Sequence, residues 1–275
     1  MTHLLVIGGV SLDLLHVKNK KVLSAGGAGV YTSMAAVHCG VKASLFAPRP
    51  DPVPEELIEV DRRLSSWLGP VVPPSRLPHF EIEHKGDNAH YLSMVIGAEG
   101  ELSVDQLPVD LSVYNCVHVT PLGDSALQQE FIKACRQRGA RMISAGTYLC
   151  TAKQNGSVVR QSIEAADVFF MNEEEACVLF GSLDQAVPQP DKLLFITRGS
   201  QGCMVVQGNQ QRQLNAVAAK VVDPTGAGDT FCGAVLAGLI RGEQPLLAAQ
   251  QASKLAALEI EAVGPAAFLQ DEFSG

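Results

Sequence analysis

The stretch "KVVDPTGAGDTFCGAVLAGL", residues 220–239, decides the fold because it joins a glycine-rich loop to a long apolar helix. Phe231, Val235 and Leu239 recur at four-residue spacing, so they would share one face of a helix that begins near Asp229. A short strand is expected at residues 221–222, just before the loop. This order of strand, glycine loop and helix predicts an anion site at the N-terminus of the helix.

The loop itself consists of Thr225, Gly226, Ala227, Gly228 and Asp229. Its backbone N–H groups would be unpaired at the helix N-terminus, and glycines there would let phosphate oxygens come close. Asp229 could instead be a simple helix cap, because Asp is common near helix N-termini. A cap alone does not explain a glycine on each side of Ala227.

Strand-like and helix-like segments alternate through most of the chain. This alternation predicts a mostly parallel sheet with helices on both faces. Strands are expected at 3–9, 42–48, 116–122, 141–146, 166–172 and 193–199, with a hairpin at 202–217. Helices are expected at 29–40, 125–139, 173–181, about 229–241 and about 245–262.

One segment, "FEIEHKGDNAHYLSMVIG" from Phe80 to Gly97, departs from this alternation. Two β-type runs flank the turn-like residues Gly86, Asp87 and Asn88, which predicts an exposed hairpin inserted into the α/β body. We therefore expect a single domain over residues 1–275, with the hairpin inserted at about 78–104.

The composition favours a globular protein and argues against several classes of partner. The chain has 29 acidic and 21 basic residues, a net charge of -8, so nucleic acid binding through a basic surface is not expected. The first residues resemble a strand rather than a signal peptide, and no apolar stretch is long enough to span a membrane. The seven cysteines form no C-x-x-C pair, which indicates free thiols in a reducing cytoplasm.

Two further candidate motifs follow expected strands. Asn172 and Glu175 come after "DVFFM", where Glu175 could hold Mg²⁺ through water, although the pair is also a capping box. Thr197, Gly199 and Gly202 follow "LLFI", where they form either a plain turn or a tight loop against a nucleotide. In isolation, the first motif favours a capping box and the second favours a plain turn.

The N-terminal region contains a second glycine-rich helix entrance. Asp13 follows the first strand, and "AGGAGVYTS" at residues 25–33 leads into a helix. This loop lacks the Lys-[Ser/Thr] ending of a Walker A motif, and no G-x-G-x-x-G follows the first strand. The histidines show no metal-binding spacing.

Taken together, these motifs resemble the ribokinase-like (PfkB) carbohydrate kinase family. "DPTGAGDTFCGAVLAGL" is similar to the C-terminal signature of that family. Asp13, the di-glycine at residues 26–27, Asn172-x-x-Glu175 and "TRGSQG" follow in the family's order. The resemblance implies a three-layer α/β/α sandwich with a mostly parallel central sheet and a small β lid.

The resemblance also implies an activity, namely transfer of the γ-phosphoryl group of ATP to a hydroxyl of a small molecule. Asp229 would be the base that takes the proton from the hydroxyl. Gly226, Ala227 and Gly228 would form an anion hole through their N–H groups. The acceptor would be a sugar, a polyol such as an inositol, or a nucleoside, and the protein would work in the cytoplasm.

The remaining site residues are assigned by the same resemblance. Glu175 and Asn172 would act on Mg²⁺ and the phosphates, and the acceptor's hydroxyls would bind Asp13 and the Gly26-Gly27 loop. The nucleotide site would be lined by Thr197, Gly199, Gly202 and Thr225. A monovalent cation such as K⁺ would lie near Asp223, and the lid would offer a surface for a homodimer.

Tyr31 is the main departure from the family pattern. Sugar kinases of this family usually carry Asn there, so an aromatic side chain predicts a substrate pocket of different shape. Two alternatives stay open at this point. One is a vitamin-type kinase acting on a hydroxymethyl heterocycle, although such relatives generally lack a lid like residues 80–97; the other is a non-catalytic ligand-binding protein.

Overall fold

A nine-stranded sheet forms the centre of the computed structural model, which describes residues 2–17, 20–85 and 88–269. In the described chain its strand order is β15-β14-β13-β12-β11-β10-β1-β4-β6, and the pairs from β13 to β6 are parallel. The parallel strands are β1 (His3–Ile7), β4 (Lys42–Phe46), β6 (Ser66–Leu68), β10 (Cys116–Val119), β11 (Ile143–Gly146), β12 (Val168–Asn172) and β13 (Leu193–Thr197). The antiparallel strands β14 (Cys203–Gln207) and β15 (Gln210–Leu214) form the expected hairpin at one edge.

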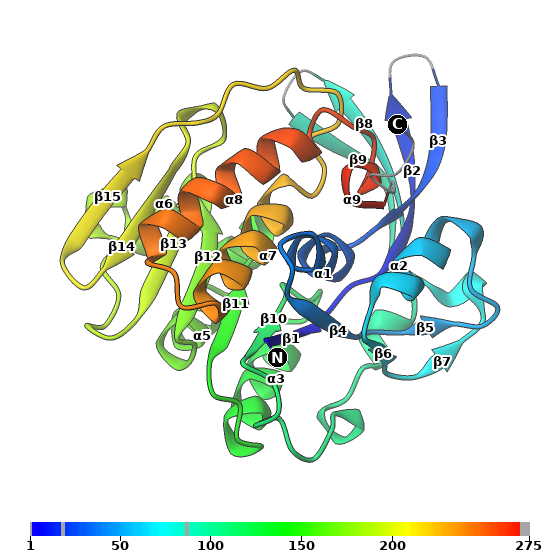
Figure 1. The fold of residues 1–275 in the computed structure, drawn as a ribbon, viewed down its shortest axis with the longest axis horizontal. Helices are drawn as coiled ribbons and strands as arrows, with labels where there is room; N and C mark the ends of the chain where they lie inside the picture. The colour runs from blue at the N-terminus through cyan, green and yellow to red at the C-terminus, as the bar shows by residue number, and fades with distance from the viewer. Residues whose placement is uncertain (1, 18–19, 86–87, 270–275) are drawn as a thin grey trace.

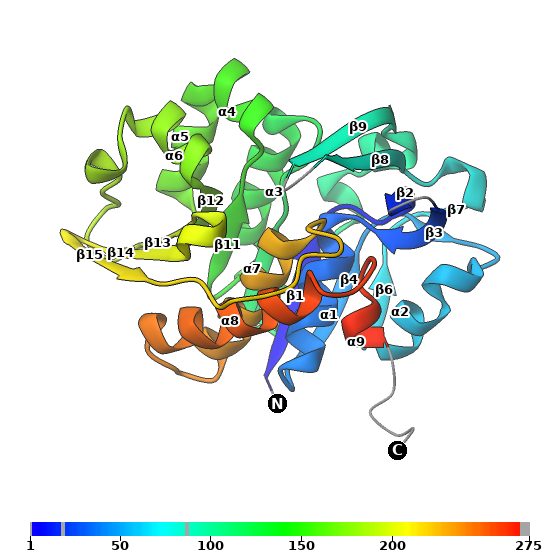
Figure 2. The same ribbon diagram turned by 90° about the horizontal axis from the view of Figure 1, so that it is seen from above.

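Helices cover both faces of this sheet, as Figure 2 shows. One face packs against α1 (Ala28–His38), α7 (Ala227–Ile240) and α8 (Pro245–Glu259), and the other against α3 (Ser125–Gln137), α5 (Gly156–Ala165) and α6 (Glu173–Phe180). The short helices are α2 (Ile58–Arg63), α4 (Leu149–Gln154) and α9 (Ala266–Leu269). The central strands are buried on both faces, which explains their uninterrupted apolar sequences. The predicted three-layer α/β/α arrangement is confirmed.

A second, four-stranded sheet lies beside the body, in the order β3-β2-β8-β9 (Figure 1). It combines β2 (Ser11–Val17) and β3 (Lys20–Gly26) with β8 (His79–Lys85) and β9 (Asn88–Val95). We call this sheet the lid. The expected hairpin at 80–97 supplies only half of it, because β2 pairs in parallel with β8. The turn residues 86–87 lie outside the described residues.

Two expectations about the local structure were wrong. Residues 221–222 form no strand, because the N–H groups of Val222 and Asp223 donate to the Ile260 carbonyl, at 2.7 and 3.1 Å. Asp13 does not merely follow the first strand but lies within β2, the lid strand whose residues alternate between buried and partly exposed. Both errors arise where segments far apart in the sequence come together.

Candidate active site

The candidate residues gather at the carboxyl ends of the parallel strands. Gly9 follows β1, Asn172 ends β12 and Thr197 ends β13. In the central sheet, β1 lies between β4 and β10. The strands that follow β1 in the sequence are first added on the β4 side and then, from β10 onward, on the other side, so the strand order reverses between β1 and β10. Open α/β sheets bind ligands at this edge, next to such a reversal.

The N-terminus of α7 is built without a side-chain cap. Gly226 is the N-cap residue in the left-handed conformation, with φ 83°, and no side chain in the described part of the chain caps it. A Cβ on Gly228 would meet no atom within 4 Å, so the space beside this residue is open. The Ala227 N–H makes only a long hydrogen bond, 3.4 Å, to the Pro224 carbonyl, so the first turn of α7 can still offer amide groups to a bound anion.

Asp229 lies in the first turn of α7 rather than at its cap. Its side chain is partly buried, and no group among the described residues hydrogen-bonds to its carboxylate. Burial raises the pKa of Asp229 to about 7, because loss of water disfavours the charged form. A carboxylate with a pKa near neutrality suits a general base better than a cap.

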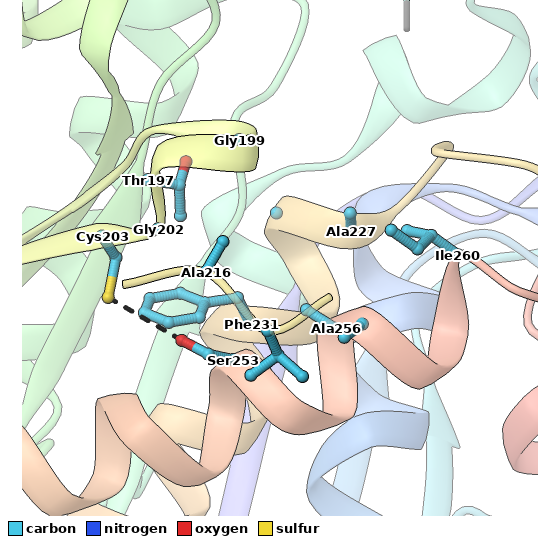
Figure 3. Close-up of a pocket in the computed structure, with 13 residues that line it drawn as sticks. Thr197, Gly199, Gly202, Cys203, Ala216, Ala227, Phe231, Ser253, Ala256 and Ile260 are labelled. Carbon is cyan, nitrogen blue, oxygen red and sulfur yellow. Dashed lines mark hydrogen bonds between the residues drawn. The ribbon is translucent and has the colours of Figure 1, made fainter. Parts of the chain in front are cut away.

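A pocket of about 200 Å³ opens beside the N-terminus of α7 (Figure 3). It brings together three residues expected at the nucleotide site, Thr197, Gly199 and Gly202, with Ala227 and Gly228. Its other walls were not expected from the sequence, because they come from four separate parts of the chain, namely β14, the segment before α7, α7 itself and α8 with its C-cap: Cys203, Ala216, Val217, Phe231, Ser253, Ala256, Ala257 and Ile260. These mainly apolar walls suit a flat ring.

Asn172 and Glu175 form the capping box of α6. The Glu175 carboxylate accepts the Asn172 backbone N–H at 2.8 Å and its side-chain amide at 2.9 Å, while the Glu175 N–H donates to Asn172 Oδ1 at 2.8 Å. Burial, and then the charges of Asp229 and Glu174, raise the pKa of Glu175 to about 7. The cap and a ligand role are therefore compatible.

The site residues fit magnesium only in partnership with phosphates. No group of three His, Cys, Asp or Glu side chains that could hold a metal occurs in the part of the chain that the structure describes. Glu175 is 6% exposed and sits within electrostatic reach of Asp229. Mg²⁺ commonly keeps several waters and binds through one or two carboxylates plus substrate phosphates, so one buried carboxylate is sufficient.

The acceptor side of the site contains Asp13 and the di-glycine loop. Asp13 is 3% exposed, its Oδ1 atom has no hydrogen-bond partner among the residues that the structure describes, and burial raises its pKa to about 6. A Cβ on Gly26 would lie 1.9 Å from Asp13 Oδ2, and one on Gly27 would lie 2.5 Å from the Gly9 carbonyl oxygen. Both glycines are thus required for the loop to pass this close to β2 and β1.

Tyr31 lies beneath the N-terminus of α7. Its side chain is 2% exposed, and a Cβ on Gly226 would lie 2.3 Å from its ring. The tyrosine therefore packs under the N-cap of α7 and has little surface left for a substrate. Burial, and then the charges of Glu259 and Asp223, raise the pKa of Tyr31 well above its ordinary value, so the phenol stays neutral.

Asp223 ties the loop before α7 to the loop after α8. Its carboxylate accepts the N–H groups of Thr225 at 3.0 Å and Gly264 at 2.9 Å. The charge of Asp223 acts on Glu259, whose side chain is fully buried. Neither carboxylate oxygen of Glu259 has a hydrogen-bond partner in the described part of the chain. No sequence pattern distinguishes Glu259 from the other charged residues of the helices.

Comparison with known proteins places this site in a family. Residues 108–272, more than half of the chain, match the family described as pfkB family carbohydrate kinase. The chain belongs to this family of small-molecule kinases, and the predicted recognition is confirmed.

Individual relatives extend the match over nearly the whole chain. A cytidine kinase of Thermococcus kodakarensis is 26% identical over 255 residues, which cover 88% of this chain and 90% of that protein. A Burkholderia thailandensis nucleoside kinase solved with inosine has a TM-score of 0.80 at 21% identity and covers 95% of this chain and 92% of its own. A Vibrio cholerae fructokinase double mutant solved with fructose, ADP and a potassium ion has a TM-score of 0.79 at 19% identity, covering 99% and 96%.

Among the residues that the structure describes, no helix has both the length and the apolar character needed to cross a membrane. All seven cysteines are free; Cys116, Cys135, Cys203 and Cys232 are buried, and Cys150 and Cys177 are exposed.

Proposed function

We propose that the protein transfers the γ-phosphoryl group of ATP to a hydroxyl of a small molecule, a sugar, a polyol such as an inositol, or a nucleoside. The observation that carries this proposal is the Asp229 carboxylate, which has no hydrogen-bond partner among the described residues and lies in the first turn of α7, beside the open space at Gly228. In this arrangement the base and the anion site are fixed by one helix. Positioning and charge stabilisation are the main demands of phosphoryl transfer.

The pocket of Figure 3 orients the nucleotide in this proposal. The adenine ring lies between the apolar walls from α8 and Phe231, and the phosphates extend along Thr197 and Gly199 towards α7. The N–H groups of Ala227 and Gly228 then face the transferring phosphoryl group, where the dipole of α7 also favours negative charge. Asp229 accepts the proton of the attacking hydroxyl.

Glu175 and Asn172 are the residues that would hold magnesium, through water, near the phosphates. Bound there, Mg²⁺ would neutralise phosphate charge. For K⁺, the proposed place is the junction of residues 223–225 with residues 260–264, where Asp223 binds both loops. The potassium ion in the fructokinase structure supports a test of K⁺ dependence.

The acceptor would bind between Asp13, the Gly26-Gly27 loop and the lid. A nucleoside is favoured within the three acceptor classes, because a cytidine kinase is similar to this chain over 88% of its length. The four-stranded lid argues against a hydroxymethyl-heterocycle kinase, whose relatives generally lack a comparable lid. The intact Asp229 and its glycines argue against a non-catalytic protein.

The oligomeric state and the compartment are further parts of the proposal. The lid strand β9 and its end expose the large apolar side chains of Tyr91, Leu92, Met94, Val95 and Ile96, which supports a homodimer formed through the lid. Replacement of Leu92 and Met94 by Ser should then yield a monomer in sedimentation analysis. The free thiols support a reducing cytoplasm.

The decisive experiment compares the wild type with Asp229→Asn. Mg-dependent ADP release should be screened over sugars, inositols, nucleosides and pyridine alcohols, guided by thermal shifts with a non-hydrolysable ATP analogue. We expect Asp229→Asn to lower kcat about 10²–10⁴-fold while it still binds nucleotide. Normal turnover in Asp229→Asn would refute the assignment of the base.

A further inference from the structure

Glu99 is a partly buried carboxylate at the ligand-binding edge that the mechanism above does not use. It belongs to a short 3₁₀ helix, Gly97–Glu101, which follows the lid strand β9. A Cβ on Gly9 would lie only 2.5 Å from Glu99 Oε2, and 4.0 Å from the Ala28 nitrogen. The carboxylate therefore rests on Gly9, immediately after β1 and near the N-terminus of α1.

Glu99 lies between the carboxyl ends of β1 and β10, the two strands at which the strand order reverses. Gly9 follows β1, and Gly123, whose backbone N–H donates to the Glu99 carboxylate, follows β10. Gly9 also contacts the di-glycine loop, since its carbonyl accepts the Gly29 N–H at 2.9 Å and faces Gly27. Glu99 and Asp13 thus lie against the same small group of glycines.

Few interactions within the described chain stabilise the negative charge of the Glu99 carboxylate. No Lys, Arg or His of the described chain forms an ion pair with it, and burial raises its pKa to about 7. A partly buried carboxylate with a single backbone donor keeps oxygen lone pairs that a bound ligand can use, which points to a role with a ligand. Its neighbour Glu101, by contrast, is exposed and pairs with Arg76.

Two tyrosines stand near Glu99 and Asp229. Tyr148 follows β11 at the start of α4, and it interacts electrostatically with Glu99, Asp229 and Tyr91. Tyr91, on β9, packs edge-on against Phe80 of β8 with 6.0 Å between ring centres, and it is within reach of Asp13 and Asp229. Both rings keep exposed surface, 42% for Tyr148 and 55% for Tyr91.

From this geometry we propose that Glu99 is a specificity-determining residue of the acceptor site, which accepts a hydrogen bond from the amino group of a nucleobase while the base lies against Tyr148 and Tyr91. The inference rests on the proposed kinase function. A carboxylate offers only acceptors, and it pairs well with an amino donor such as that of cytosine. The flat faces of the tyrosines suit a planar base.

This assignment predicts discrimination between amino and keto bases. Cytidine and adenosine present an amino group, whereas uridine and inosine present a carbonyl oxygen that a carboxylate would repel. A site that holds a buried polar group for one substrate rejects the analogue that leaves it unpaired. We therefore expect the wild type to prefer cytidine over uridine and adenosine over inosine.

The test measures KM and kcat for these four nucleosides in the wild type, Glu99→Gln, Gly9→Ala and Glu101→Gln. Glu99→Gln should raise KM for cytidine and adenosine about 10- to 100-fold with kcat within about threefold, and should lower KM for uridine and inosine, because the neutral amide no longer repels their carbonyl oxygen and can donate to it. Gly9→Ala should act in the same direction, because its methyl group displaces the Glu99 carboxylate. Glu101→Gln is the matched control and should behave as the wild type.

Thermal unfolding of each variant separates misfolding from lost recognition. If Glu99→Gln is folded but raises KM equally for all four nucleosides, or for none, the proposal is overturned. Turnover of sugars or polyols with no turnover of nucleosides overturns it too, and leaves the proposed kinase function standing. If the wild type phosphorylates no acceptor, the kinase proposal itself fails.

Discussion

Two glycine-rich helix entrances, those of α1 and α7, look alike in sequence and differ in what surrounds them. Each has a glycine N-cap with a positive φ, 93° at Gly27 and 83° at Gly226, and neither has a side-chain cap. At α1, the protein's own atoms fill the space beside Gly26 and Gly27. At α7, the space beside Gly228 is open.

The difference shows that a glycine at a helix entrance can serve packing or ligand access. The α1 entrance needs glycines because the Gly9 backbone and the Asp13 carboxylate come too close for a Cβ. The α7 entrance uses Gly226 for packing against Tyr31 and leaves Gly228 exposed. Only the second arrangement leaves room for a phosphate.

The largest effect on the fold is expected at the filled entrance. Gly27→Ala should lower the free energy of unfolding by about 2–4 kcal/mol, because the new Cβ overlaps the Gly9 carbonyl at a positive φ. Urea unfolding measures this change. Gly40→Ala is the control: its φ is also positive, at 78°, but no atom lies within 4 Å, so only the smaller strain of the backbone should appear. Equal losses in the two variants would contradict the packing explanation.

The carboxylates at the two entrances should give the activity a pH dependence. The pKa of Asp229 is raised to about 7 and that of Asp13 to about 6. Because a base must be deprotonated, kcat should rise with pH and level off above about 8, and titration of Asp229 alone should lower it by about 50-fold between pH 7 and pH 5. A kcat that is constant over this range would argue against Asp229 as the base.

An intermediate effect is expected where the two entrances meet, at Gly226 and Tyr31. Gly226→Ala should destabilise the fold by about 1–3 kcal/mol and also reduce turnover, because the Cβ strikes the Tyr31 ring and shifts the loop. Tyr31→Ala in the same chain should remove that clash, so the double mutant should be more stable than the sum of the single losses predicts. Additive losses would show that the contact does not matter.

The smallest effect is expected at Glu259, deep beneath the open entrance. Burial raises its pKa to about 10, so the folded protein holds a proton that the unfolded chain releases above about pH 4.5. Its contribution to stability is therefore present below pH 4.5 and is lost as the pH rises towards 10. Glu259→Gln, which is always neutral, should raise the Tm at pH 8 by about 2–4 °C and leave it unchanged at pH 4. A lower Tm at pH 8 would indicate that the carboxylate binds a cation.

Local sequence patterns predicted the layers of the fold because they depend on nearby residues. The apolar strands and the α7 periodicity are examples, and so is the loop at Gly226. The sequence missed features made by distant segments: β2 pairing with β8, the pocket walls from α8, and Glu99 resting on Gly9. Tyr31 shows the same limit, because nothing in its neighbours reveals that it packs under Gly226.

The central claim is that the open entrance of α7 binds the transferring phosphoryl group, and Gly228→Ala tests it most directly. Alanine there meets no protein atom and favours a helix, so the Tm should stay the same or rise. Its methyl group would occupy the space that the phosphate needs, so kcat/KM should fall by about 10²–10³-fold. A folded Gly228→Ala enzyme with the wild-type kcat/KM would contradict the account.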